Sequence, residues 1–117
     1  MDLRLGRILV VDDDASVVDL LTELLEHENV EARGTTQAQD VMCMIEEFQP
    51  DAIFIDLQMP SLDGLDLLQL IREVHSDLKV VIVSGFVDKA ALLRATRLGI
   101  SAVIEKPFGA NSLRTYL

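Results

Sequence analysis

Short apolar runs alternate along the chain with longer segments in which apolar residues recur every three or four positions. The short runs, which we expect to be strands, are Ile8 to Val11, Val30 to Thr35, Ala52 to Ile55, Val80 to Val83 and Ala102 to Ile104. All but Val30 to Thr35 are continuously apolar, which is typical of a parallel sheet covered by helices on both faces. The more polar run, Val30 to Thr35, is predicted to be an edge strand.

The intervening segments predict helices that each bury one face. Their apolar stripes are Val17, Leu20, Leu21, Leu24 and Leu25, then Ala38, Val41, Met42 and Ile45, then Leu67, Leu70, Ile71 and Val74. Thr36 and Gln39 are expected to form a capping box, Asp88 to cap a helix from Lys89 to Leu98, and Gly99 to follow that helix at its C′ position.

The repeated strand-helix order predicts a doubly wound α/β sandwich with five parallel strands. The chain has 117 residues, half of them hydrophobic, so we expect a single domain over residues 1–117 with one substantial core. The last predicted helix, Asn111 to Leu117, supplies barely two turns. Either the domain has a short final helix or the chain is truncated.

Charge and cysteine usage narrow the classes of partner. Twenty acidic against ten basic residues give a net charge of −10, which argues against direct contact with nucleic acid or anionic membranes. No apolar run approaches the length of a membrane span, and the N-terminus does not resemble a signal peptide. Cys43 is the only cysteine, which excludes an internal disulfide and favours the reducing cytoplasm.

Polar residues follow the predicted strands at their carboxyl ends, where open parallel sheets bind ligands. They are Asp12, Asp13 and Asp14 after the first strand, Asp56 after the third, Ser84 after the fourth, and Glu105 and Lys106 after the fifth. We therefore expect an acidic pocket that also contains one lysine and one hydroxyl.

Carboxylates gathered in one pocket repel each other, and a bound cation removes that cost. Oxygen ligands without histidine or thiolate favour Mg²⁺, or Mn²⁺, over zinc. A metal and Lys106 would neutralise an incoming phosphate, Ser84 would donate a hydrogen bond, and a carboxylate could act as the nucleophile.

Four motifs carry a resemblance to a known family. They are VVDDD, the segment FIDLQMPSLDG from Phe54 to Gly64, Ser84-Gly85 and Lys106-Pro107. Through them the chain resembles the receiver domains of bacterial response regulators over essentially its whole length. The resemblance implies a flavodoxin-like three-layer sandwich with strand order 2-1-3-4-5.

The resemblance also implies roles for the site residues. Asp56 would be the phosphoacceptor, and Asp13, Asp12 through water and the backbone carbonyl of Gln58 would hold Mg²⁺. Ser84 and Lys106 would grip the phosphoryl oxygens. A sensor histidine kinase or a phosphotransfer protein would donate the phosphoryl group, so that the domain is a signalling switch of a two-component phosphorelay rather than an enzyme.

In such domains the surface formed by the fourth helix, fifth strand and fifth helix reports the change, and it is the expected place for a homodimer contact. The peptide bond before Pro107 is often cis in the family. This chain departs from the pattern at Val103, three positions before Lys106, where the family usually has an aromatic residue. The coupling that moves a buried ring together with the hydroxyl residue cannot operate here in that form.

Other interpretations compete with these. Asp14 is better explained as an N-cap of the first helix than as a ligand. An aspartyl-phosphate phosphatase would need a second acid at Gln58, and a nucleotide-binding module of the flavodoxin sort would need a phosphate loop in place of DDDAS. A pseudo-receiver would keep the fold without phosphorylation. His27 and His75 are expected at the surface and Cys43 to be inert.

Overall fold

The computed structural model describes residues 6–57, 64–85, 89–106, 109 and 113. Its strands are β1 (Arg7–Val11), β2 (Glu31–Thr35), β3 (Ala52–Ile55), β4 (Lys79–Ser84) and β5 (Ala102–Glu105). Its helices are α1 (Ala15–His27), α2 (Val41–Phe48), α3 (Gly64–Val74) and α4 (Lys89–Leu98), and a short 3₁₀ turn, η1 (Ala38–Asp40), leads into α2. Among the described residues, no helix is long and apolar enough to cross a membrane.

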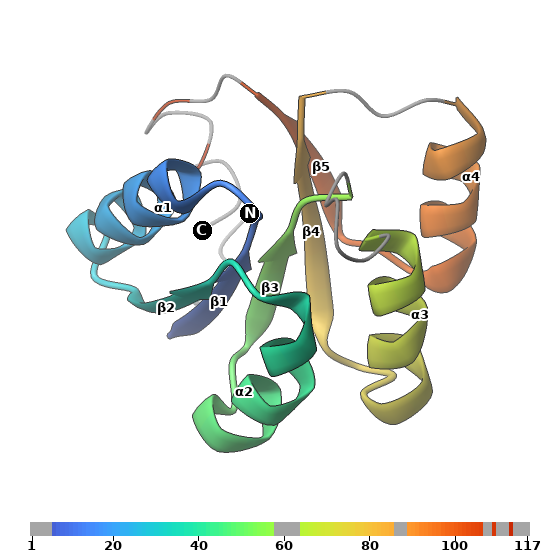
Figure 1. Ribbon diagram of the computed structural model, residues 1–117, viewed down its shortest axis with the longest axis horizontal. Coiled ribbons are helices and arrows are strands. Elements are labelled where there is room, and N and C mark those ends of the chain that lie inside the picture. Colours follow the sequence, from blue (N-terminus) through green and yellow to red (C-terminus); the bar gives the residue numbers. More distant parts are fainter. Residues whose placement is uncertain (1–5, 58–63, 86–88, 107–108, 110–112, 114–117) are drawn as a thin grey trace.

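The strands form one parallel sheet in the order β2-β1-β3-β4-β5 (Figure 1). The predicted order is confirmed, and the polar strand β2 does lie at an edge. Val11 is paired with Thr35 on one side and with Ile55 on the other, and Ser84 is paired with Glu105. β1, β2 and β3 end in register, and β4 and β5 end together two residues beyond the partner of Ile55, so the residues that follow the strands meet at one edge of the sheet.

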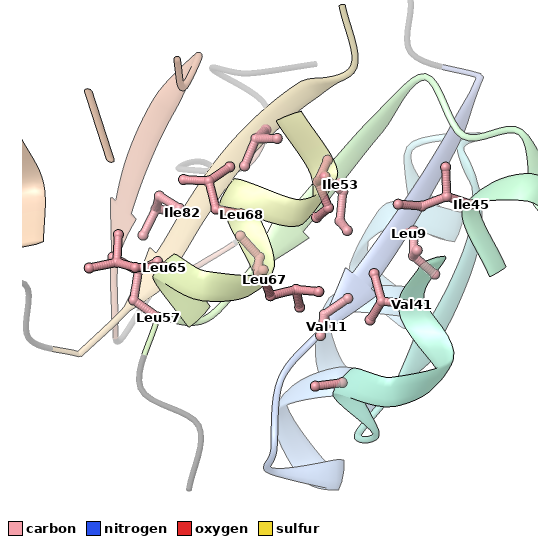
Figure 2. Packing of buried hydrophobic residues seen from close by; sticks show 14 of the residues in the cluster. Leu9, Val11, Val41, Ile45, Ile53, Leu57, Leu65, Leu67, Leu68 and Ile82 are labelled. Carbon is pink, nitrogen blue, oxygen red and sulfur yellow. The ribbon is translucent and has the colours of Figure 1, made fainter. Parts of the chain in front are cut away.

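Helices cover both faces of the sheet, as the continuous apolar strands predict. α1 packs on one face, where Val18, Leu21 and Leu25 join strand residues such as Val10 and Phe54. α2, α3 and α4 cover the other face (Figure 1), and their buried side chains meet the alternate strand residues (Figure 2). The result is the three-layer sandwich expected from the sequence.

Two of the predicted helix stripes are partly wrong. In α1 the predicted Leu21 and Leu25 are buried, but Val18, which the stripe did not include, is buried as well, and the predicted Leu20 is 46% exposed. In α3, Leu68 is buried, whereas Leu70 and Val74 are 46% and 60% exposed. Both helices carry apolar residues around much of their circumference, so spacing alone did not show which of them face the sheet.

Some of the residues predicted to cap the helices do so in the structure, and others do not. Gly99 follows α4 with a φ of +95°, as expected of a C′ glycine. The capping box is wrong, because the Gln37 amide donates to Thr35 Oγ1 (3.0 Å) and the side chain of Gln39 bonds to Gln37 at the start of η1. Asp88 and, apart from the buried Leu113, the predicted final helix lie outside the described residues.

Candidate functional site

The carboxyl ends of four strands bring the predicted polar residues together. Asp12, directly after β1, is 1% exposed, and Asp56, directly after β3, is 4% exposed. Ser84 ends β4 and is fully buried. The backbone amide of Lys106 donates to the Ser84 carbonyl (3.0 Å), so the chain after β5 stays beside β4. The sheet itself therefore positions all four residues.

Lys106 bridges two of the buried carboxylates. Its Nζ lies 2.7 Å from Asp12 Oδ2 and 3.2 Å from Asp56 Oδ2. Partial burial acts to lower the pKa of the ammonium group, but the hydrogen bond and charge of Asp12, together with Asp56, outweigh burial and raise the pKa of Lys106 above its ordinary value. Lys106 is therefore charged at neutral pH and is held by Asp12 and Asp56 within the acidic site.

Three carboxylates form the acidic site. Asp12, Asp13 and Asp56 each offer an oxygen within 4.8 Å of the others, and Asp13 is exposed where the other two are buried. Asp12 is oriented further by the Asp14 amide, which donates to Asp12 Oδ1 (3.0 Å). Several carboxylate oxygens with one side open to solvent match the preference of Mg²⁺ for oxygen ligands and retained waters. The donor set therefore fits the cation that the sequence suggests.

Asp14 stands apart from the other two acids of the DDD segment. Its Oδ1 accepts hydrogen bonds from the backbone amide (2.9 Å) and hydroxyl (2.6 Å) of Ser16 at the start of α1. The Ser16 hydroxyl, followed by the Ser16 amide, lowers the pKa of the Asp14 carboxyl. Its interpretation as an N-cap is confirmed.

Only some of the other predicted positions lie among the described residues. Gln58 and Pro107 lie outside the described residues, so the backbone ligand and the cis bond remain predictions. Val103 is half-buried and packs against the core on the α4 side of the sheet. Sequence reasoning missed Thr35, whose carbonyl accepts the Asp12 amide (3.3 Å). Its position at the end of the strand beside β1 was the available signal.

Neither the two histidines nor Cys43 belongs to the acidic cluster of Asp12, Asp13 and Asp56. His27 is exposed as expected, but His75 is half-buried, with Nε2 3.2 Å from Glu46 Oε1. Cys43 is exposed on α2, and its hydrogen bond to Glu47 raises the pKa of the thiol. A raised pKa leaves less reactive thiolate, which supports the prediction that Cys43 is inert.

Comparisons with known proteins agree on one family. The family model of the response regulator receiver domain matches residues 8–117 of this chain. The nitrogen assimilation regulatory protein NtrX of Azorhizobium caulinodans is 37% identical over 108 residues, which are 91% of this chain and 24% of that protein. The chain thus spans about a quarter of the length of this relative.

Solved structures show the same similarity. The receiver domain of NtrX from Brucella abortus is 36% identical, with a TM-score of 0.86 over 93% of this chain and 92% of that one. A CheY-like receiver domain protein from Methanospirillum hungatei is 27% identical, with a TM-score of 0.90 over 96% and 90% of the two chains. The family match, the sheet order and the acidic site at its carboxyl edge lead to one conclusion: the chain belongs to the response regulator receiver domain family.

Proposed function

We propose that this receiver domain is a phosphorylation switch in which Asp56 accepts a phosphoryl group. The observation that carries the proposal is the 3.2 Å contact between Asp56 Oδ2 and Lys106 Nζ, in a site that also holds Asp12 and Asp13. A structural ion pair would need one carboxylate for one lysine. Extra buried or clustered acids are costly, and they are explained by a site that binds a cation and an anionic group.

In the proposed reaction a carboxylate oxygen of Asp56 attacks the phosphorus of a donor. The new O–P bond makes an acyl phosphate, and the bond between phosphorus and the donor breaks, its electron pair leaving with the donor group. Lys106 would neutralise charge on the phosphoryl oxygens, and the Ser84 hydroxyl would donate a hydrogen bond to one of them. Water later hydrolyses the acyl phosphate, which releases inorganic phosphate and restores the Asp56 carboxylate. Phosphorylation of Asp56 would thus be a reversible signal rather than the turnover of a separate substrate.

Asp12, Asp13, Asp56 and the backbone carbonyl of Gln58 are the proposed holders of Mg²⁺. When bound, the cation would offset negative charge shared by the carboxylates and the phosphoryl oxygens. Mn²⁺ has the same preference for oxygen ligands and is the proposed substitute. The mixture of buried and exposed acids supports this assignment, because Mg²⁺ sites usually keep several waters.

We further propose that the donor is a sensor histidine kinase or a phosphotransfer protein in the cytoplasm, where an exposed free thiol such as Cys43 stays reduced. An output partner or a second copy of the chain would bind the face of α4 and β5. Leu92 and Leu93 support this location, because they are 40% and 51% exposed on α4. The net charge of −10 supports a role without direct nucleic-acid contact.

The proposal is tested by incubating the chain with acetyl phosphate, with Mg²⁺ or with a chelator, and recording the intact mass. The wild type should gain one phosphoryl group only when Mg²⁺ is present. Asp56→Asn removes the nucleophile but keeps the shape of the side chain, so it should gain none. A variant that gains the same mass as the wild type would show that Asp56 is not the acceptor.

A further inference from the structure

Gly64 begins α3 directly against the backbone that follows Asp56. Its amide donates to the Leu57 carbonyl (3.2 Å). A Cβ atom added at Gly64 would lie 2.5 Å from Leu57 Cα, 2.6 Å from the Asp56 carbonyl oxygen and 3.0 Å from the Leu57 carbonyl carbon. All three are backbone atoms, which cannot rotate aside like the tip of a side chain. Any side chain here would displace either α3 or the backbone of Asp56 and Leu57.

Glycine is required at position 64 because a side chain would not fit there, and not because the backbone adopts a positive φ. Among the glycines of the described residues only Gly99 has a positive φ. At Gly34 an added Cβ would collide with the side chain of Val18, which belongs to the packing of α1 on the sheet. Gly64 differs from Gly34 because the atoms in its way belong to the backbone of the proposed phosphoacceptor and its neighbour.

α3 is held too firmly to move away from that contact. Its residues Leu68 and Ile71 are fully buried in the core. At its far end Arg72 donates to the carbonyl of Leu98 (3.1 Å) and, through Nη2, to that of Gly99 (2.7 Å). Moving the helix would break these contacts as well as its packing. A methyl group at position 64 would therefore act mainly on the chain after β3.

That chain carries the reactive carboxylate. The Asp56 amide donates to the Val11 carbonyl (3.0 Å), and its carboxylate lies 3.2 Å from Lys106 Nζ. Asp12, Asp13 and Asp56 share a space in which their oxygens lie within 4.8 Å of each other. A misplacement of about 1 Å in a reacting group can lower a rate by about 100-fold. Displacement of the Asp56 backbone would thus be felt in the chemistry.

We propose that Gly64 is a positioning residue for phosphorylation: its missing side chain lets α3 close against the Asp56 carbonyl and so sets the place of the Asp56 carboxylate beside Lys106. This inference rests on the proposed function of Asp56. Gly64 touches none of the reacting atoms, and it acts through the backbone of Asp56 and Leu57.

The test compares Gly64→Ala with Leu68→Ala, a variant that leaves a cavity under the same helix and therefore also lowers stability. Both are studied at 10 °C with trimethylamine oxide, which favours the compact state, after circular dichroism has shown that they are folded. The first readout is the initial rate of labelling by acetyl phosphate with saturating Mg²⁺. The second is the set of amide chemical shifts of Asp56, Leu57 and Lys106 in chelator.

Gly64→Ala should be labelled about 100-fold more slowly than the wild type, with shifted Asp56 and Leu57 amides in chelator. Leu68→Ala should keep the wild-type rate and shifts. Equal rates for Gly64→Ala and wild type, or equal slowing of both variants, would overturn the proposal. So would a Gly64→Ala chain that stays unfolded, because Gly64 would then serve the whole fold.

The second readout separates this inference from the proposed function. If the wild type itself takes up no phosphate, the proposed function fails. The role of Gly64 is then tested only by the amide chemical shifts recorded in chelator. Unmoved Asp56 and Leu57 amides in folded Gly64→Ala would then overturn the positioning role, whereas displaced amides would support it.

Discussion

Replacing Lys106 with methionine should destabilise the domain, and Mg²⁺ should restore part of the lost stability. Methionine keeps most of the length of the side chain but removes the charge that lies 2.7 Å from Asp12 and 3.2 Å from Asp56. The two carboxylate side chains are 2% and 6% exposed, so water cannot replace the lost ammonium group fully. The variant therefore retains two neighbouring buried carboxylates without their cation.

The size of the effect follows from that burial. Removing one partner of a buried ion pair costs about 3–5 kcal/mol, and we take about 3 kcal/mol because the Lys106 side chain is 23% exposed. A cation that binds only the folded protein at 100 times its Kd adds about 2.7 kcal/mol. The variant lacks the competing ammonium group, so it should bind Mg²⁺ more tightly than the wild type. A tenfold lower Kd would return about 1.4 kcal/mol of the loss.

Urea unfolding in chelator and in Mg²⁺ measures both quantities. Lys79→Met is the matched control, because Lys79 is an exposed lysine at the opposite end of β4, and its variant makes the same change in net charge. It should lose little stability and respond to Mg²⁺ as the wild type does. The reasoning is refuted if Lys106→Met is as stable as the control in chelator, or if Mg²⁺ stabilises Lys106→Met less than the wild type.

Three further predictions concern single residues of the site. Asp13→Ala should lose most Mg²⁺ affinity in calorimetric titration, whereas Asp14→Ala should keep it, because Asp14 caps α1; equal losses would refute this division. The raised pKa of Lys106 means that its stabilising charge is fully present below its ordinary value of 10.5 and is lost as pH rises through the raised folded value. Urea unfolding should therefore show a decline above about pH 10.5 in the wild type that is weaker in Lys106→Met, and equal declines would contradict the bridge. Because Val103 has no polar tip and few rotamers, phosphorylation should shift amides mainly at Ser84 and the start of α4, and equally large shifts throughout β5 would show that the response spreads without an aromatic ring.

Much of the fold could be predicted because continuous apolar strands leave few arrangements. The run from Ala52 to Ile55 is buried on both faces, as its composition indicates. Glycine at position 99 and the fourth helix were also predicted correctly, since each depends on local chemistry. Edge strand β2 was recognisable by its polarity alone.

The errors arose where several residues could serve the same purpose. Leu20 and Leu21 are equally apolar, and it is the packing of α1 on the sheet that buries Leu21 and leaves Leu20 46% exposed. The capping box failed for a similar reason. Thr36 was expected to cap the helix together with Gln39, but Gln37 is the N-cap residue of η1, and its amide donates to Thr35 Oγ1.

The sequence predicted which residues form the site but not the distances between them. The position of each polar residue after a strand predicted that Asp12, Asp56, Ser84 and Lys106 meet at one edge. Nothing in the spacing indicated that Lys106 would contact Asp12 more closely than Asp56. The close approach of α3 to the Asp56 carbonyl was hidden as well, because a glycine in a motif does not reveal which atoms lie beside it.

The identity of the acceptor is the central claim, and reduction of the phosphorylated chain with borohydride tests it most directly. Borohydride converts an acyl phosphate on aspartate to homoserine, which tandem mass spectrometry can place at a single residue. After reaction with acetyl phosphate and Mg²⁺, homoserine should appear at Asp56 and be absent when a chelator replaces Mg²⁺. Homoserine at Asp12 or Asp13 instead of Asp56, or at no residue of the chain, would contradict the account.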